Sequence, residues 1–292
     1  MMTFDSKSFP ILCRPALSKD TSDVMELTSH IWEGHDYIPY VWQDWLADTE
    51  GLLAVAESGG RVVGLGKLTR FAADDWFMEG LRVHPDWQAR GIATRLNDYI
   101  LSFWQRNCEG SVRLATASYN VKVHHMCERN GFQRVAEFVP HAAPALQEGN
   151  AGFEQVTPVE LPSVIDFVRQ SPTFRLGHSL LNIGWRWAGL NASHLQKALD
   201  EKQIWWWRDK QGLLGFWLDE EDEELRPQIL LALCPIDQLV DLLLDYRRLA
   251  AQLGKNQAGW AAPVNPQVES ALQQAGFERS WDLSLYIFEL KK

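Results

Sequence analysis

The segment Gln88-Ala89-Arg90-Gly91-Ile92-Ala93 carries the clearest chemical pattern in the chain. It joins a strand-like stretch, Trp76 to Val83, to a stretch from Ile92 to Arg106 in which apolar residues recur at helical spacing. The start of a helix offers unpaired backbone N–H groups and the positive end of the helix dipole. Small residues at Gly91 and Ala93 let a pyrophosphate approach that backbone closely. The pattern predicts a site for a nucleotide-like cofactor, and an ordinary strand-to-helix turn is the alternative interpretation.

The charge of the surrounding segment favours an anion site. Residues 82–134 contain eight Arg or Lys and four Asp or Glu, so they carry +4 while the whole chain of 292 residues carries −10. The acidic total argues against a nucleic-acid-binding surface over most of the molecule. The candidates for contact with phosphates, each of which could equally be a solvated surface residue, are Arg90, Arg95, Lys122 and Arg129.

The periodicity of the first half predicts the elements that position this segment. Strand-helix-strand-helix order after a three-strand meander indicates an α/β class with a mixed sheet and a parallel pair. The expected strands are Ile11–Ala16, Leu52–Glu57, Val62–Thr69, Trp76–Val83 and Val112–Ala117, and the expected helices are Ser18–Trp32, Ile92–Arg106 and Val121–Asn130.

The second half repeats this order. Asn120 and Gly131-Phe132 recur as Asn265 and Gly276-Phe277, displaced by 145 positions, which indicates a duplication. We therefore expect domains at 1–142 and 152–292, joined by a linker at 141–152. The second half has no glycine loop, because Cys234-Pro235-Ile236-Asp237 runs directly into a helix, and we expect it not to bind the cofactor. The acidic run Asp219–Glu224 predicts a solvated turn between strands.

The run Glu79-Gly80-Leu81-Arg82-Val83-His84-Pro85, then the Gln88–Ala93 segment, Asn120 and Gly131-Phe132, resembles the GNAT superfamily of acetyl-CoA-dependent N-acetyltransferases. The resemblance covers Ile11 to about Val139. It implies a GNAT-like N-terminal domain followed by a degenerate GNAT-like second domain. It also implies acetyl-CoA as cosubstrate, bound through Leu81, Arg82, Val83, Gln88, Ala89, Arg90, Gly91, Ile92, Ala93, Thr94 and Asn120.

The implied reaction is attack of a free amine on a thioester, which needs a base for the ammonium and a proton for the departing thiolate. Glu79 is the expected base, although a surface glutamate is the alternative. Where the family commonly has a tyrosine acid, this chain has Cys127, which is either a proton donor or a small buried apolar residue. His124 could face a metal together with Cys127 or Glu128, but no third ligand is evident, so we expect no metal.

The segment His35-Asp36-Tyr37-Ile38-Pro39, followed by Trp42 and Trp45, is similar within that superfamily to the vertebrate histidine N-acetyltransferases. This similarity implies an acceptor pocket lined by Tyr37, Tyr40 and Trp42. The alternative is that these aromatic residues pack at a corner between two helices.

The sequence therefore predicts an N-acetyltransferase that acts on a primary amine, either a small molecule or an amino acid. An acetyl-CoA-binding module that has lost catalysis, or an acetyltransferase for proteins or peptides, are the alternatives. Four scattered cysteines and the lack of a signal peptide or apolar span lead us to expect a cytoplasmic protein without membrane or nucleic-acid partners. The oligomeric state is left open.

Overall fold

The computed structural model describes residues 10–219 and 226–292, and these form two compact units. One unit comprises residues 1–112 with 291–292, and the other comprises residues 113–290. The division falls inside strand β5 (Ser111–Ala117). The domains expected at 1–142 and 152–292 rest on the sequence repeat and stay a prediction.

The first unit is built on an antiparallel meander in the order β1-β2-β3-β4. Its elements are β1 (Leu12–Pro15), the 3₁₀ turn η1 (Ser18–Asp20), α1 (Thr21–Ser29), η2 (Trp32–Gly34), α2 (Ile38–Ala47), β2 (Leu52–Ser58), β3 (Arg61–Ala72), β4 (Asp75–Val83), η3 (Pro85–Trp87) and α3 (Ile92–Asn107). The predicted meander and the helix from Ile92 are confirmed. The first helix ends before its predicted end at Trp32, because Trp32 and Glu33 adopt φ values of 46° and 58°.

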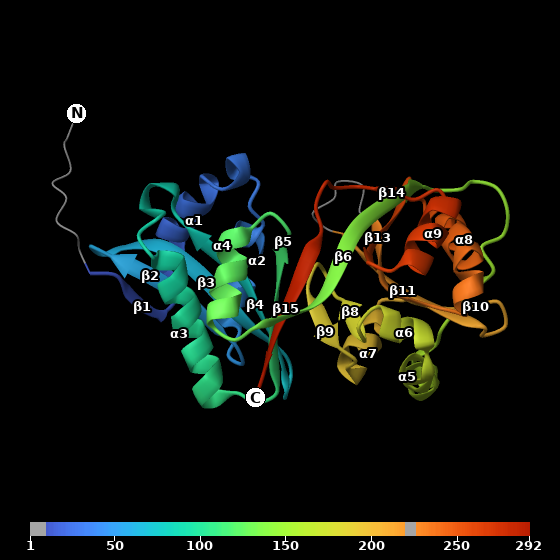
Figure 1. Cartoon of the computed structure of the whole chain (residues 1–292), viewed down its shortest axis with the longest axis horizontal. Coiled ribbons are helices and arrows are strands. Elements are labelled where there is room, and N and C mark those ends of the chain that lie inside the picture. The colour runs from blue at the N-terminus through green and yellow to red at the C-terminus, as the bar shows by residue number, and fades with distance from the viewer. Residues whose placement is uncertain (1–9, 220–225) are drawn as a thin grey trace. The chain divides into compact units, whose positions relative to one another are not determined.

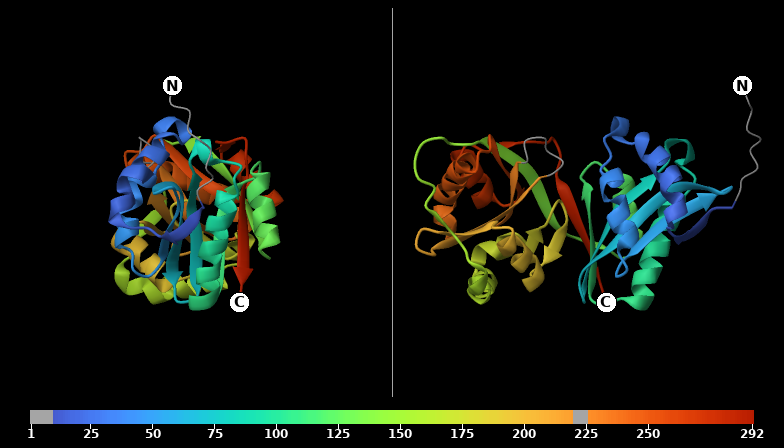
Figure 2. Two further views of the ribbon diagram at one scale, coloured as in Figure 1. Left: turned by 90° about the vertical axis from the view of Figure 1, so that its left-hand side faces the viewer. Right: turned by 180° about the vertical axis from the view of Figure 1, so that it is seen from behind.

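Helices cover both faces of this meander. Leu65 of β3 belongs to an apolar cluster with Val24 and Leu27 of α1 and with Trp42 of α2. The adjacent Gly66 faces the other way, since a Cβ there would lie 2.9 Å from Cδ1 of Ile100 in α3. Alternation along β3 thus separates the α1–α2 face from the α3 face, as the left view of Figure 2 shows.

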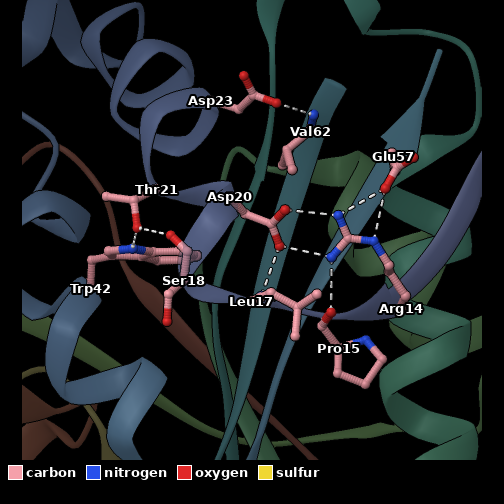
Figure 3. A network of polar contacts seen from close by, with 10 residues as sticks. All are labelled: Arg14, Pro15, Leu17, Ser18, Asp20, Thr21, Asp23, Trp42, Glu57 and Val62. Carbon is pink, nitrogen blue, oxygen red and sulfur yellow. Dashed lines mark hydrogen bonds and ion pairs between the residues drawn. The ribbon is translucent and has the colours of Figure 1, made fainter. Parts of the chain in front are cut away.

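A polar network attaches the start of α1 to the sheet (Figure 3). The Arg14 guanidinium donates hydrogen bonds to both oxygens of Asp20 and to Glu57, at 2.7–2.8 Å. Burial acts to raise the pKa of Asp20, but the hydrogen bonds from Arg14 and from the Leu17 N–H outweigh it and hold that pKa below its usual value. The Trp42 indole donates to the Thr21 hydroxyl at 3.0 Å and so joins α2 to α1.

The second unit contains a sheet with the strand order β5-β15-β6-β13-β12-β11-β10-β7. Its strands are β6 (Gln133–Pro144), β7 (Phe153–Gln155), β10 (Ile204–Trp207), β11 (Gly212–Leu218), β12 (Pro227–Leu233), β13 (Gln257–Pro263), β14 (Glu278–Arg279) and β15 (Leu285–Lys291), with β8 (Leu180–Asn182) and β9 (Trp187–Gly189) as a separate pair. Its helices are α4 (Val121–Arg129), η4 (Pro158–Glu160), α5 (Leu161–Gln170), α6 (Pro172–Leu176), α7 (Ala192–Asp200), η5 (Ile236–Gln238), α8 (Leu239–Gln252) and α9 (Pro266–Gln274).

Two apolar cores lie on opposite faces of β10 to β13. One core includes Trp207 and residues of α8 and α9, and the other includes Trp206 and residues of α5, α6 and α7. Figure 1 shows these two helical layers on either side of the strands. The strand and helix order predicted for this half is confirmed, and the order resembles that of the first half.

Two sequence-based expectations need comment. The first four residues of the predicted linker, His141 to Pro144, are strand residues that pair with β13. Apart from Asp219, the predicted acidic turn lies outside the described residues.

Candidate active site

The predicted phosphate segment forms an exposed turn between η3 and α3. Ala89 and Gly91 adopt left-handed φ values of 61° and 75°. Gly91 is the N-cap of α3. The space beside its Cα is open, since a Cβ built there would meet no atom within 4 Å. Left-handed residues beside a helix start direct successive N–H groups to one side, which is the backbone arrangement that binds phosphate oxygens. The residues present therefore fit a pyrophosphate group.

The basic candidates around this turn have different surroundings. The Arg90 guanidinium lies over the Trp87 ring at 4.7 Å and donates to the Asp86 carbonyl at 3.1 Å. Arg95 lies in the first turn of α3 and is exposed. Lys122 and Arg129 are exposed residues of α4 in the second unit. Their predicted contacts with phosphates stay predictions.

A β-bulge in β4 brings two charged residues to the same face of the sheet. Leu65 lies opposite Arg82 and Lys67 lies opposite Glu79, so two residues of β4 oppose Gly66 alone. Residues directly opposite each other on antiparallel strands share a face, and Leu65 faces α1 and α2. Glu79 and Arg82 therefore both face the α1–α2 side. In a regular strand, two residues three positions apart would point to opposite faces.

Gly80 makes this bulge possible. Its φ is 65°, and a Cβ there would lie 2.5 Å from Cη2 of Trp45. Both the backbone conformation and the close approach of the indole require a residue without a side chain. The Glu79–Pro85 run is recognisable in the sequence, whereas the bulge within it depends on strand register.

Glu79 lies partly buried in a polar strip on this face. It accepts a hydrogen bond from the Thr69 hydroxyl. Lys67, which is opposite Glu79, is buried and forms an ion pair with Asp48. Burial acts to raise the pKa of Asp48, but hydrogen bonds from Lys67 and from the Glu50 N–H outweigh it and lower that pKa.

Arg82 is held by a buried carboxylate and two aromatic rings. Its Nε and Nη2 donate to the two oxygens of Asp36 at 2.9 and 3.3 Å, and Asp36 is fully buried. The guanidinium lies over the Trp32 ring at 4.4 Å and near the Tyr37 ring at 5.5 Å. Asp36 and Trp32 were not assigned a role from the sequence. Nothing in their spacing indicated an ion pair with a strand residue 46 positions away.

The three predicted acceptor residues lie in three different environments. Tyr37 is half-buried and meets Trp45 edge to face at 6.1 Å. Trp42 is fully buried in the α1–α2 core, and Tyr40 is 87% exposed. Their role in binding an amine stays a prediction, and Tyr37 is the one beside the Arg82 side chain.

Asn120 and Cys127 belong to α4 of the second unit. Asn120 is the N-cap residue of α4, and Cys127 is buried on that helix with 2% exposure. Burial and the nearby charge of Glu128 raise the pKa of the Cys127 thiol to about 12. His124 makes a 3.1 Å contact from Nε2 to the Ala117 carbonyl and packs against Tyr286 and Phe288. Since a carbonyl only accepts, this nitrogen carries the proton and is not free to bind a metal.

Comparison with known proteins shows which family this segment is similar to. The family model described as Acetyltransferase (GNAT) family matches residues 21–132, which are less than half of the chain. This segment contains β4, the turn at Gly91 and α3, together with the predicted base and acceptor residues.

One curated relative of this segment is a protein named histidine N-acetyltransferase, from Oreochromis niloticus. It is 32% identical over 81 residues, which make up 27% of this chain and 23% of the relative. A relative of the same name from Xenopus tropicalis is 29% identical over 89 residues, 30% of this chain and 27% of the relative. The chain thus matches about a quarter of the length of these curated relatives.

Solved structures share the fold over nearly the whole chain. A GCN5-related N-acetyltransferase from Sphaerobacter thermophilus superposes with a TM-score of 0.65 at 12% identity, covering 97% of this chain and 96% of that chain. A tandem GNAT protein from the clavulanic acid biosynthesis pathway gives a TM-score of 0.57 at 13% identity, covering 96% of this chain and 98% of that chain. The expected α/β fold class with a mixed sheet is confirmed, and a tandem GNAT protein is among the structures that share this fold.

Two further findings concern expected absences. Within residues 10–219 and 226–292, no helix has the length and apolar character needed to cross a bilayer. The four cysteines, Cys13, Cys108, Cys127 and Cys234, are all free thiols.

Proposed function

We propose that this chain transfers the acetyl group of acetyl-CoA to the primary amine of a small molecule, with an amino acid as the leading class of acceptor. The observation that carries the proposal is the open turn at Ala89 and Gly91 ahead of α3, inside the residues that match the GNAT family. When bound, acetyl-CoA supplies an activated acetyl thioester.

The residues that would hold the cosubstrate come from one strand and one turn. The exposed residues Gln88 to Gly91 and the first N–H groups of α3, from Ile92 to Thr94, would bind the pyrophosphate. The backbone of Leu81 to Val83, on and beyond the bulge, would pair with the pantetheine arm.

Glu79 would take the proton of the acceptor ammonium. It is partly buried on the α1–α2 face, and the Thr69 hydroxyl orients its carboxylate. A protonated amine has no lone pair, so removal of this proton must precede attack on the thioester. Arg82 would hold the α1–α2 loop beside this carboxylate through Asp36, Trp32 and Tyr37.

Cys127 is poorly suited to protonate the departing thiolate. Its pKa of about 12 lies well above the ordinary thiol pKa of about 8.5, so proton transfer from Cys127 to a thiolate is uphill. We propose that solvent supplies this proton and that Cys127 packs in the core of α4.

The acceptor class is supported by the printed name of the curated relatives, histidine N-acetyltransferase. A screen of the purified full chain for thiol release from acetyl-CoA, against free amino acids, polyamines and amine-terminated peptides, tests it. We expect turnover with a free amino acid. Turnover with peptides alone would instead identify a protein or peptide acetyltransferase. Saturable acetyl-CoA binding without turnover on any amine would indicate a binding module without catalysis.

A further inference from the structure

Two histidines and a glutamate meet on the α1–α2 face, next to the turn that precedes α3. Glu26 lies in the last turn of α1, His30 is the C-cap residue of that helix, and His84 directly follows β4. One ligand atom from each of the three lies within 4.8 Å of the other two. None of these residues has a part in the acetyl transfer described above.

The distances from Glu26 to both histidines match those of a metal site, and the third lies within 4.8 Å. Zinc binds histidine nitrogen and carboxylate oxygen at about 2.0–2.2 Å in tetrahedral geometry, which places any two ligand atoms roughly 3.3–3.5 Å apart. Glu26 Oε1 lies 3.2 Å from His30 Nε2 and 3.4 Å from His84 Nε2. Glu26 and His30 are four positions apart and so project from the same side of the helix end. One ion can therefore reach all three with a short movement of His30.

The cluster is also accessible to solvent. The Glu26 and His30 side chains are 42% and 51% exposed, whereas His84 is 13% exposed. Arg61 lies 3.5 Å from the second Glu26 oxygen and would compete with a cation for this carboxylate, but its side chain is 65% exposed and can turn to solvent.

We infer that Glu26, His30 and His84 bind a divalent transition-metal ion of the Zn²⁺ class, with water in the fourth position. Two imidazoles and one carboxylate are a ligand set that zinc accepts when a site keeps one open position. This inference departs from the sequence-based expectation of no metal, which considered only the neighbourhood of His124.

Metal binding at His84 would alter the turn that follows it. The Nδ1 atom of His84 accepts a hydrogen bond from the Asp86 N–H at 3.2 Å and so caps η3. An imidazole that binds metal through Nε2 carries its proton on Nδ1 and can no longer accept this bond. The metal thus removes a cap from η3, which directly precedes the Gln88–Gly91 turn.

Titration of the full chain with Co²⁺, which replaces zinc and absorbs visible light when bound tetrahedrally, tests the site. We expect a saturable visible absorption band that Zn²⁺ abolishes by displacement. His30→Gln should weaken Co²⁺ binding at least about tenfold, because one of three ligands is lost. His35→Gln, a matched change at an exposed histidine of the same loop, should leave binding unchanged.

Two results would overturn the site. One is a Co²⁺ spectrum without a tetrahedral band at saturating metal, and the other is equal affinity in the wild type and the His30→Gln variant. Circular dichroism of each variant separates loss of a ligand from loss of the fold, and Glu26→Gln provides a second ligand variant in case His30→Gln is unstable.

The coupling to the cofactor turn rests on the proposed function, whereas the metal site does not. Loss of a cap costs about 1 kcal/mol, so saturating Zn²⁺ should weaken acetyl-CoA binding about fivefold, and acetyl-CoA should weaken Zn²⁺ binding equally. Calorimetry with and without Zn²⁺ measures both. Equal acetyl-CoA affinities would remove the coupling and leave the metal site standing, and an absence of acetyl-CoA binding altogether would refute the proposed function instead.

Discussion

The two halves of the chain build the same strand-turn-helix unit in two ways. In the first half, η3 is separated from α3 by four exposed residues, Gln88 to Gly91, two of which are left-handed. In the second half, η5 ends at Gln238 and α8 begins at the next residue, Leu239. The first turn of α8 also carries an acidic residue, Asp241, whereas the first turn of α3 has none. A free helix start alone does not make an anion site, since the preceding turn must also open it and the charge must suit it.

The halves are alike in the strand before that turn. Gly215 of β11 lies opposite Leu231 and the next residue, Phe216, lies opposite Ile229, so Leu230 is an extra residue in β12. Counted back from Pro85 and Pro235, this bulge occupies the same place as the one at Gly80. The same count aligns Glu79 with Ile229 and Arg82 with Ala232. The second half thus keeps the backbone geometry and lacks the charged side chains that the first half places on it.

The largest expected loss of activity comes from removing the carboxylate of Glu79 from β4, since β12 has no carboxylate at that place. Glu79→Gln keeps the shape of the side chain and removes its basicity, so kcat/KM should fall by roughly 10²- to 10⁴-fold. Steady-state kinetics with the acceptor found in the amine screen measure this. Glu57→Gln, at a strand glutamate that pairs with Arg14, is the control and should retain activity. Equal activity of the Glu79→Gln and wild-type enzymes would remove Glu79 from the mechanism.

A smaller effect should follow from closing the first turn. Gly91→Glu places a carboxylate in the open space of the turn and forces a side chain into a left-handed backbone, so acetyl-CoA affinity should fall by roughly 100-fold. Gly254→Glu in the second half is a matched control. Gly254 has a φ of 73° and equally open surroundings, so the backbone strain is the same. Unchanged affinity in calorimetry of the Gly91→Glu variant would show that this turn does not bind the cosubstrate.

As the pH falls, the free energy of unfolding of the second unit should decrease before that of the first. Burial lowers the pKa of His141 and His178 in the second unit, so these residues bind protons less readily than in the unfolded chain. Below about pH 6.5 the unfolded chain takes up more protons, and the free energy of unfolding of this unit should fall. In the first unit, Asp20 and Asp48 have lowered pKa values, so their contribution persists until the pH falls below about 4.

Hydrogen exchange of the full chain at pH 7 and pH 5, with rates corrected for intrinsic exchange, measures this difference. Protection should drop first in peptides from the second unit. His141→Asn should reduce the drop, because it removes a titrating group. A first unit that opens earlier than the second would contradict the assignment.

The smallest expected change in kcat/KM follows from replacing Cys127. Cys127→Ala should change kcat/KM by less than about threefold. The raised pKa of Cys127 makes it a weak acid, and a weak acid contributes little to protonating the departing thiolate. Some stability will be lost with the buried sulfur, so the assay belongs well below the melting temperature. If this variant loses as much activity as Glu79→Gln while it keeps its acetyl-CoA affinity, Cys127 is a proton donor after all.

Periodicity predicted most elements of both halves, because strands and helices that bury one face carry their pattern locally. The strand expected at Val112–Ala117 matches β5, which begins one residue earlier at Ser111, and the helix expected at Val121–Asn130 ends one residue earlier, at Arg129. The duplication was visible because Asn120 and Asn265 are N-cap residues and Gly131 and Gly276 adopt left-handed φ values after the helices.

Other features could not be predicted because they depend on distant partners. The helix α2 starts at Ile38-Pro39 without a side-chain cap, and its Trp42 donates a hydrogen bond to Thr21 of α1. The strand β6 extends into the predicted linker as far as Pro144, because β13 pairs with it. The Asp36–Arg82 pair and the face of Glu79 follow from strand register, which a local pattern does not contain. The turn at Gly91 was found because glycine beside a helix start is a local signal.

The bulge at Gly80 determines which face of the sheet the later residues of β4 point to. One extra residue inverts the facing of every position that follows, so deletion of Gly80 would turn Arg82 toward α3 and bring Leu81 to the polar side. A point substitution at Glu79 alters a single side chain, whereas loss of the bulge reverses a whole stretch of polar and apolar neighbours at once. This asymmetry gives a reason why a duplicated strand can lose its carboxylate and still retain its extra residue. Ile229, at the same place in β12, belongs to the apolar core with α8 and α9, so a carboxylate there would be buried among apolar side chains.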